Sequence, residues 1–305
     1  MDRFDALQAF ARVVETGSFT QAARALDVSR TTVTQLVQQL EAHLRVKLLH
    51  RTTRRLRVTD DGAAYYERVV RVLADLEDAD TSLSEASVAL RGRLRVDVPA
   101  PLARLVLVPA LPGFLARYPE IQLELGVSDR MVDLIGDPVD CVLRGGELAD
   151  STLIARRVGA LAMGVYAAPA YLKRAGRPAH PLDLAAEPHR LVGYRGWRSG
   201  KVAPLTLQRA GERVALQGRH ALTVDDGNAH LAAGLAGLGA LGLPRYMAQP
   251  HVAVGELLPL LGDWAIEPMP LHLAFPAHRH VSAKLRTFID WVVELMAQPP
   301  LAAPA

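Results

Sequence analysis

The sequence predicts a chain of mixed class, in which a small helical segment at the N-terminus precedes a larger α/β region. Two observations lead to this expectation. From Leu94 onward, apolar runs such as RLRVDVP, IQLELGV and DCVLRGG alternate with helical stretches, which is the α/β pattern. Charge is also uneven, because residues 1–59 contain ten Lys and Arg against five Asp and Glu, whereas the remaining residues contain 25 against 27. A basic segment of this kind is typical of nucleic-acid binding.

Two short helices joined by the tight turn DVS are predicted near the N-terminus. Ser18 and Gln21 form the pattern of a capping box at the start of the first helix. Ala22 and Ala23 are small enough to let a second helix cross closely, and Ser29 is placed to cap that second helix. Its inward positions are Val33, Leu36, Val37 and Leu40. This order is the helix-turn-helix pattern.

The outward face of the second helix has the composition of a DNA-reading surface. Its predicted DNA contacts are Ser29, Arg30, Thr31, Thr32, Thr34, Gln35 and Gln38. None of these side chains is acidic, and hydroxyl and amide groups can donate to and accept from base edges in the major groove. A solvated polar face is the alternative interpretation, and the next segment favours DNA.

The segment LLHRTTRRLRV predicts a short strand pair, or wing. Leu56 and Val58 alternate with Arg55 and Arg57, so a hairpin places its apolar side inward and its guanidinium groups outward. Such groups suit phosphate contact or insertion into a minor groove. The predicted wing contacts are Arg51, Thr52, Thr53, Arg54, Arg55 and Arg57.

The runs DRFDALQAFARVVETGSFTQAARAL, DVS, QQLEAHL and LLHRTTRRLRVTDDG resemble, in this order, the DNA-binding domain of LysR-type transcriptional regulators. The resemblance continues through nearly the whole chain. It implies a winged helix-turn-helix domain at 1–59, a linker and dimerisation helix at 60–90, and an effector-binding domain at 91–305 similar to type 2 periplasmic binding proteins. The implied lobe I comprises 91–161 and 267–305, and lobe II comprises 162–266.

The resemblance implies a sequence-specific DNA-binding transcriptional regulator, not an enzyme, controlled by a small-molecule effector bound between the lobes. Its implied partner is double-stranded DNA with an inverted-repeat operator. The alternative is a solute-binding protein or enzyme built on the two-lobed domain, with the basic N-terminus as a nonspecific anchor. That alternative needs a catalytic constellation or an export signal, and the sequence offers neither.

Two positions depart from the family pattern. Arg45 follows the recognition helix where the family usually has Gly, so we expect the turn there to take another shape. Ala100 and its flanking prolines supply no hydroxyl group in the first loop of the effector domain, where many family members have one.

A long helix is predicted from Thr59, which can cap it, to about Leu90. A heptad seam runs along it through Tyr66, Val69, Leu73, Leu76, Leu83 and Leu90. We expect the seam to pair two subunits into a homodimer, which can assemble further into a dimer of dimers. In such a homodimer, two-fold symmetry places two recognition helices on neighbouring major grooves. The alternative is that the seam packs on its own domain.

Ligands of open α/β sheets bind beyond the carboxyl ends of the strands, which places an effector in the cleft between the lobes. The predicted effector contacts are Pro99, Ala100, Pro101, Ser128, Arg144, Gly145, Gly196, Trp197, Asp225 and Asp226. The arginines Arg144, Arg195 and Arg198 favour a small organic anion. Asp225 and Asp226 favour an amine or a hydroxylated ligand if they reach the cleft, but Asp226 also fits a helix cap.

Other motifs indicate no cofactor, metal or catalytic site. Gly237, Gly239 and Gly242 spell GxGxxG, but a helical stretch precedes them, the reverse of the nucleotide-binding order, so they more simply end a helix tightly against a strand. His278 and His280 have no third ligand at suitable spacing. Cys141 is the single cysteine and is expected to be buried in a strand. The N-terminus has no export pattern and no uninterrupted apolar run is long enough to span a bilayer, so we expect a cytoplasmic protein without membrane contact.

Overall fold

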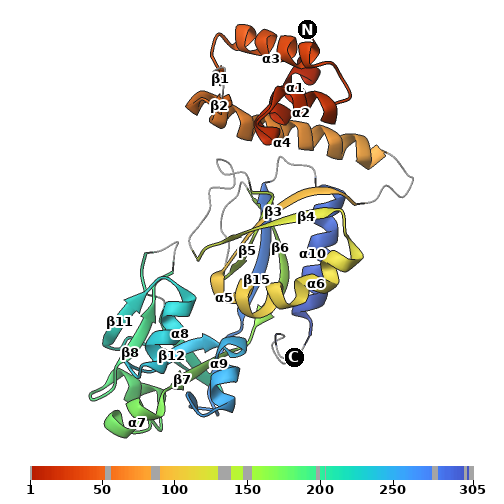
Figure 1. Ribbon diagram of the computed structural model, residues 1–305. Helices are drawn as coiled ribbons and strands as arrows, with labels where there is room; N and C mark the ends of the chain where they lie inside the picture. Colours follow the sequence, from red (N-terminus) through yellow and green to blue (C-terminus); the bar gives the residue numbers. More distant parts are fainter. Residues whose placement is uncertain are drawn as a thin grey trace. The chain divides into compact units, whose positions relative to one another are not determined.

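The computed structural model describes residues 2–51, 56–83, 90–129, 139–146, 153–196, 200–202, 204–276, 281–298 and 301. The chain divides into two compact units, Met1–Val88 and Ala89–Ala305 (Figure 1). Each unit has a hydrophobic core of its own.

The N-terminal unit contains helices and one hairpin: α1 (Arg3–Thr16), α2 (Phe19–Ala25), α3 (Arg30–Leu44), β1 (Leu49–Arg51), β2 (Leu56–Val58) and α4 (Asp60–Leu83). The caps predicted from the sequence are confirmed. Ser18, Ser29 and Thr59 accept backbone N–H groups at the starts of α2, α3 and α4. Ala22 and Ala23 are buried where α2 meets α3, as expected, so the small residues let the helices cross closely.

The turn after α3 corrects one expectation. Arg45 adopts the left-handed conformation with φ 56°, and its N–H donates to the Ala42 carbonyl at 3.3 Å. The N–H of Val46 donates to the Glu41 carbonyl at 3.2 Å. These bonds satisfy the last carbonyls of the helix, which offsets the strain of a side chain in this conformation, so the turn keeps the shape that Gly would give it.

The first half of the predicted seam of helix α4 packs against the core of the N-terminal unit. Val69 is buried in the N-terminal core, and Tyr66 and Leu73 pack against that core. Leu76 is 44% exposed and its neighbour one turn earlier, Val72, is 55% exposed. The expectation that the whole seam pairs two subunits is therefore wrong for its first half.

The far end of the predicted helix is also corrected. The described helix ends at Leu83, and Leu90 is not helical. Leu90 packs instead against the core of the C-terminal unit. Residues 84–89 lie outside the described part of the chain.

The C-terminal unit begins with a five-stranded sheet in the order β4-β3-β5-β15-β6. Its strands are β3 (Gly92–Val98), β4 (Ile121–Val127), β5 (Cys141–Gly145), β6 (Leu153–Leu161) and β15 (Met269–Pro276). Strand β3 runs parallel to β4 and β5, whereas β15 runs antiparallel to β5 and β6. The helical stretch expected between IQLELGV and DCVLRGG, residues 131–136, lies outside the described residues.

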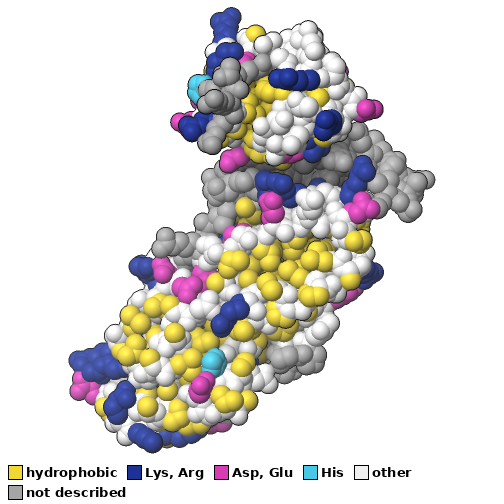
Figure 2. Space-filling model, in the orientation of Figure 1, with side chains coloured by type: hydrophobic (Ala, Val, Ile, Leu, Met, Phe, Trp, Pro, Cys, Tyr) yellow, Lys and Arg dark blue, Asp and Glu magenta, His cyan; other side chains and the backbone are white. Residues whose placement is uncertain are grey.

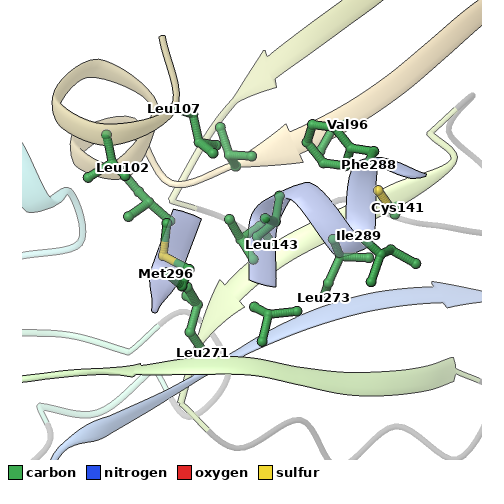
Figure 3. Close-up of a cluster of buried hydrophobic side chains, with 14 of the residues drawn as sticks. Val96, Leu102, Leu107, Cys141, Leu143, Leu271, Leu273, Phe288, Ile289 and Met296 are labelled. Carbon is green, nitrogen blue, oxygen red and sulfur yellow. The ribbon is translucent and has the colours of Figure 1, made fainter. Parts of the chain in front are cut away.

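One face of this sheet is covered by helices. These are α5 (Ala100–Leu102), a π-helical turn (Ala103–Leu107), α6 (Val108–Arg117) and α10 (Ala283–Met296). Cys141 and Leu143 point into the cluster between sheet and helices (Figure 3), while Val142 faces the other side with Ala274. This alternation is the period of a strand. Cys141 is a buried strand residue as expected, and burial raises the pKa of its thiol well above the usual value.

The rest of the unit forms smaller sheets. Their strands are β7 (Met163–Ala167), β8 (Leu191–Tyr194), β9 (Leu205–Arg209), β10 (Glu212–Leu216), β11 (His220–Val224), β12 (Leu241–Pro244), β13 (Leu258–Leu260) and β14 (Ala265–Ile266). The helices are α7 (Pro169–Ala175), α8 (Gly227–Leu235), α9 (Arg245–Ala253) and a 3₁₀ turn, Pro181–Ala185. The chain leaves the five-stranded sheet after β6, enters β7 one residue later and returns between β14 and β15.

The glycine motif after α8 has the structural role that the sequence predicted. Helix α8 ends beside Gly237, which has φ 72°, and a Cβ on Gly239 would lie 2.7 Å from the Arg190 carbonyl oxygen. The glycines thus let the helix end close to neighbouring backbone.

The segment Ala100–Arg117 is long and apolar enough to cross a membrane by length and composition alone. Arg104 interrupts this segment, so it is not an uninterrupted apolar run, to which the expectation from the sequence refers. The same segment contributes Leu102, Leu107 and Phe114 to the core of the C-terminal unit, and a core helix passes the same test.

A buried carboxylate joins α3 to the hairpin. Glu41 is 4% exposed; its Oε1 accepts the N–H groups of Leu48 and Leu49 at 3.0 and 3.1 Å, and its Oε2 accepts Lys47 Nζ at 2.8 Å. Burial alone raises the pKa of this carboxyl, but the hydrogen bonds from Lys47, Leu49 and Leu48 outweigh burial and lower the pKa below 4.5. The ionised form is therefore the one that the fold stabilises.

Replacing Glu41 with Gln should lower the free energy of unfolding at neutral pH by about 1–3 kcal/mol, because an amide cannot accept both backbone N–H groups and pair with Lys47. Because the pKa is lowered in the folded state, the stabilisation is present above the unfolded value and is lost as the pH falls below it. Urea unfolding at pH 7 and at about pH 4 should show the difference between wild type and Glu41→Gln shrinking. Glu15→Gln, which removes an exposed pair with Arg12 and keeps an amide oxygen to accept the Tyr66 hydroxyl, is the control; a loss as large as that of Glu41→Gln would contradict a special role for the buried carboxylate.

Candidate nucleic-acid interface and ligand cleft

Helix α3 presents a polar face on the side opposite its buried residues. Thr31, Gln35 and Gln38 are exposed, and Thr34 is half-buried. Val33 and Val37 are fully buried on the other side. The structure thus places these predicted contacts together on one outward surface of the second helix.

Ser29 and Thr32 are engaged in the cap that begins α3. Ser29 Oγ accepts the N–H of Thr32 at 3.0 Å and lies 2.8 Å from Thr32 Oγ1. Arg30 is exposed beside them. The two hydroxyls therefore hold the start of the helix, and their oxygens remain at its exposed N-terminal end.

The wing is an antiparallel hairpin in which His50 faces Arg57 and Leu49 faces Val58. Directly opposed residues share a face, so His50 and Arg57 are exposed side by side. Leu49 is buried, but Val58 is 37% exposed, so the apolar side of the hairpin is less covered than expected. His50 is a candidate contact that the sequence reasoning missed, although its alternation with Leu49 signals an outward position.

Part of the predicted wing lies beyond the described structure. Thr52, Thr53, Arg54 and Arg55 lie outside the described residues, and only the backbone of Arg51 is described. Among the side chains that are drawn, Figure 2 shows Lys and Arg at several places on the visible face of the N-terminal unit.

The C-terminal unit contains a cavity of about 800 Å³. It is lined by residues from the part that holds the five-stranded sheet and from the part that holds the smaller sheets. Of the predicted effector contacts, Pro99, Pro101, Arg144, Gly145 and Gly196 line it. Ala100, Ser128, Asp225 and Asp226 are not among the lining residues, and Trp197 lies outside the described chain together with Arg198, His278 and His280.

Both acidic residues before α8 have other partners. Asp226 caps the helix by accepting the N–H of Ala229 at 2.7 Å. Asp225 pairs with Arg195 at 2.9 Å. The structure thus gives Asp226 the capping role that the sequence also allowed and gives Asp225 an ion pair, and neither residue lines the cavity.

The arginine of the cleft is neutralised within the protein. Arg144 is 3% exposed and forms an ion pair with Asp97, which is 5% exposed. Its Nη1 also donates to the carbonyls of Leu143 at 2.9 Å and Asp97 at 3.3 Å. Arg195 is likewise paired, with Asp225. The presence of these arginines, which favoured an anionic ligand, therefore does not mean that the cleft offers an unpaired positive charge.

Asp129 is a cleft residue that the sequence reasoning missed. It follows β4 and lines the cavity. Its Oδ1 accepts the N–H of Ala100 at 2.9 Å, and its Oδ2 accepts the N–H of Gly227 at 2.5 Å. The signal in the sequence was its place one residue after Ser128, beyond the end of a strand.

Two tyrosines add neutral hydroxyl groups to the cavity wall. Burial, together with Asp129 and then Asp226 and Asp225, raises the pKa of Tyr194 to about 12. Burial and Asp129 also raise the pKa of Tyr246. Both side chains line the cavity as un-ionised phenols at neutral pH, able to donate or accept a hydrogen bond.

His230 stands behind Tyr194, with its ring 5.6 Å from the phenol ring between centroids. Burial lowers the pKa of His230, although its hydrogen bond to the Val192 carbonyl acts in the opposite direction. The neutral ring donates from Nε2 to that carbonyl at 3.0 Å. His230 thus supports the wall of the cavity as an uncharged group.

Most of the remaining wall is apolar. The aliphatic residues that line the cavity include Leu161, Leu191, Val192, Val202, Leu205, Leu216, Leu241, Leu243, Ile266 and Leu271. Within the described part of the chain, no group of three or more His, Cys, Asp or Glu is arranged to hold a metal ion. Fold and site together define a protein in which a helix-turn-helix is followed by a domain with a ligand-sized cleft.

Comparison with known proteins identifies the family. The model of bacterial regulatory helix-turn-helix proteins of the lysR family matches residues 4–63, and that of the LysR substrate binding domain matches residues 88–297. An HTH-type transcriptional repressor of Pseudomonas aeruginosa is 39% identical over 300 residues, which are 98% of this chain and 94% of that protein. The HTH-type transcriptional activator AaeR of Escherichia coli is 31% identical over 298 residues, 98% of this chain and 95% of AaeR.

A solved structure agrees. That of CrgA, a LysR-type transcriptional regulator from Neisseria meningitidis, is similar with a TM-score of 0.60 and 32% identity, covering 96% of this chain and 99% of CrgA. The chain belongs to the LysR family of transcriptional regulators. It combines the DNA-binding and effector-binding domains of that family. Its relatives over both domains are named transcriptional regulators, not solute-binding proteins.

Replacing Asp226 with Ala should lower the free energy of unfolding by about 0.5–2 kcal/mol, because α8 loses the side chain that caps it. Asp225→Ala is the matched control, since it removes an exposed ion pair worth about 0–1 kcal/mol. Urea denaturation of the two variants measures the difference. Equal losses for both would show that the cap contributes no more than the surface pair.

Proposed function

We propose that this regulator binds operator DNA through α3 and the β1–β2 hairpin, and that a small molecule bound in the cavity of the C-terminal unit controls this binding. The observation that supports the first part is the exposed face of α3, which has hydroxyl and amide side chains and no acidic group among the predicted contacts. The observation that supports the second part is a mainly apolar cavity of ligand size.

The DNA contacts divide into two groups by chemistry. Thr31, Thr34, Gln35 and Gln38 suit base edges in the major groove, because their side chains both donate and accept. Arg57 and His50, which share a face of the hairpin, suit the phosphate backbone. We assign the other predicted contacts, Ser29, Arg30, Thr32, Arg51, Thr52, Thr53, Arg54 and Arg55, to positioning on the same duplex.

The proposed active form is a homodimer on an inverted-repeat operator, able to form a dimer of dimers in the cytoplasm. Its support is the apolar surface that α4 leaves open at Val72 and Leu76, one helical turn apart. Two copies related by two-fold symmetry can cover this surface and present two α3 helices to successive major grooves.

Gln35→Ala should weaken binding to the specific operator by about 1–3 kcal/mol and relax preference at one base position, because the lost contact matters only for sequences that offered it. Arg57→Ala should weaken all sequences alike and flatten the salt dependence, because a phosphate contact does not depend on sequence. Fluorescence anisotropy with the upstream DNA of the protein's own gene and a random duplex distinguishes the two effects. Arg156→Ala, which removes an exposed pair with Asp290, is the control and should change neither.

If Gln35→Ala lowers binding to the specific and random duplexes equally, the assignment of α3 as the base-reading helix is incorrect. Equal binding of the wild-type protein to both duplexes would contradict the proposed function itself.

Leu76→Asp should shift the protein from dimer to monomer, because it places a carboxylate in the apolar contact between two α4 helices. Leu73 is not a suitable site for this test, since it packs on the core of its own unit. Ala63→Asp is the matched control, because Ala63 is exposed in the first turn of the same helix, on the side away from Val72. Sedimentation at micromolar concentration measures both; a dimer that survives Leu76→Asp would place the interface elsewhere.

A further inference from the structure

We propose that Asp129 occupies the anion-binding position of the cleft, so that the cavity takes an uncharged, mainly apolar effector and rejects carboxylates. This inference rests on the proposed function, because it assigns a chemical class to the ligand of the same cavity. It replaces the organic anion that the arginine count favoured.

The anion-binding position is a pair of backbone N–H groups, those of Ala100 and Gly227, which we call the amide pair. Ala100 follows β3 of the five-stranded sheet, and Gly227 begins the nine-residue helix α8 in the other part of the unit. Both donate to the carboxylate of Asp129, at 2.9 and 2.5 Å. Two N–H groups from facing segments, one of them at the positive end of a helix, form the kind of site that binds a carboxylate.

The close approach at the amide pair depends on the absence of a side chain at Gly227. A Cβ at this position would lie 2.6 Å from Pro101 Cγ and 3.3 Å from Asp129 Oδ2. The backbone can therefore reach the carboxylate only with glycine here. Since Pro101 also lines the cavity, this contact lies at the wall where a ligand binds.

With Asp129 bound to the amide pair, the described lining residues leave no buried cation to neutralise a ligand carboxylate. Arg144 is buried against Asp97, and the hydroxyl groups of Tyr194 and Tyr246 are un-ionised. Of the other charged or titratable lining residues, His230 is buried, and burial lowers its pKa, so its ring is neutral. Arg213, His220 and Glu267 are exposed, so water screens them.

A ligand carboxylate that entered the interior would meet the like charge of Asp129 and would lose its own hydration without gaining an equivalent partner. An alcohol, ketone or lactone with an apolar body meets no such cost. It can bond to the phenols of Tyr194 and Tyr246 and bury its hydrocarbon against the aliphatic wall. The chemistry of the wall thus selects against charge on the effector.

Removing the Asp129 carboxylate should reverse this selectivity. In Asp129→Ala the amide pair loses its acceptor, so a small carboxylate from solution can take the vacated position. We expect acetate to bind the variant at least about tenfold more tightly than wild type, because it restores charge-assisted hydrogen bonds to two N–H groups. Gly227→Ala should not acquire acetate binding, because it leaves Asp129 in place and crowds the amide pair.

The experiment measures the melting temperature of the full-length chain with acetate against chloride at constant ionic strength, and with cyclohexanol against cyclohexanecarboxylate. A ligand that binds only the folded state raises that temperature. Wild type should be stabilised more by cyclohexanol than by cyclohexanecarboxylate, and Asp129→Ala should gain stabilisation by acetate. Glu256→Ala, which removes an exposed carboxylate that contacts His251 outside the cavity, should behave as wild type. Asp129→Ser, whose shorter side chain also leaves room for acetate at the amide pair, serves if the Ala variant does not fold.

The proposal would be overturned if cyclohexanol and cyclohexanecarboxylate raised the melting temperature of wild type equally. It would also be overturned if acetate raised the melting temperature of the folded Asp129 variant no more than chloride does. Failure of the proposed function gives a different result. Acetate would then bind Asp129→Ala as expected but leave its affinity for operator DNA unchanged in the anisotropy assay, so the amide pair would stand while its regulatory role would not.

Discussion

Backbone N–H groups at the junctions between elements need acceptors, and in this protein carboxylates supply them at the points on which both units depend. Glu41 takes two N–H groups of the hairpin that forms the wing, which fixes that hairpin to the recognition helix. Asp129 takes two from segments on either side of the cleft. Asp183 takes those of Ala179 and His180, both at 2.9 Å. A single oxygen of Glu41 and of Asp183 accepts both N–H groups, whereas Asp129 uses one oxygen for each. A carboxylate suits these places because it has several acceptor sites and its bonds are charge-assisted.

The need to pair buried charges explains why the number of arginines near the cleft did not indicate the charge of the ligand. Arg144 and Asp97 are 47 positions apart in the chain, but neighbouring parallel strands bring them together and bury them as a pair. Arg195 and Asp225, 30 positions apart, pair at the ends of β8 and β11 in the same way. Buried charges must be paired, so an arginine near a cleft is available to a ligand only when the fold has given it no carboxylate.

Helix α4 shows how a small domain uses a seam that the sequence assigns to dimerisation. A domain of under 90 residues buries a limited apolar area, and Val69 and Leu73 complete its core. Val72, which precedes Leu73 but faces another side of the helix, and Leu76, one turn after Val72, remain on the surface. The periodicity of a helix records which residues share a face, but it does not record what covers that face.

The sequence by itself determined the elements that depend on neighbours in the chain. Caps at Ser18, Ser29 and Thr59, the buried face of α3 and the strand position of Cys141 follow from local hydrogen bonding and periodicity, so they could be predicted. Only the tertiary structure decided the pairing of Arg144 and the place of Asp129 between Ala100 and Gly227. These depend on groups 29 to 98 positions away whose distances are set by sheet register and helix packing, and no local pattern encodes that geometry.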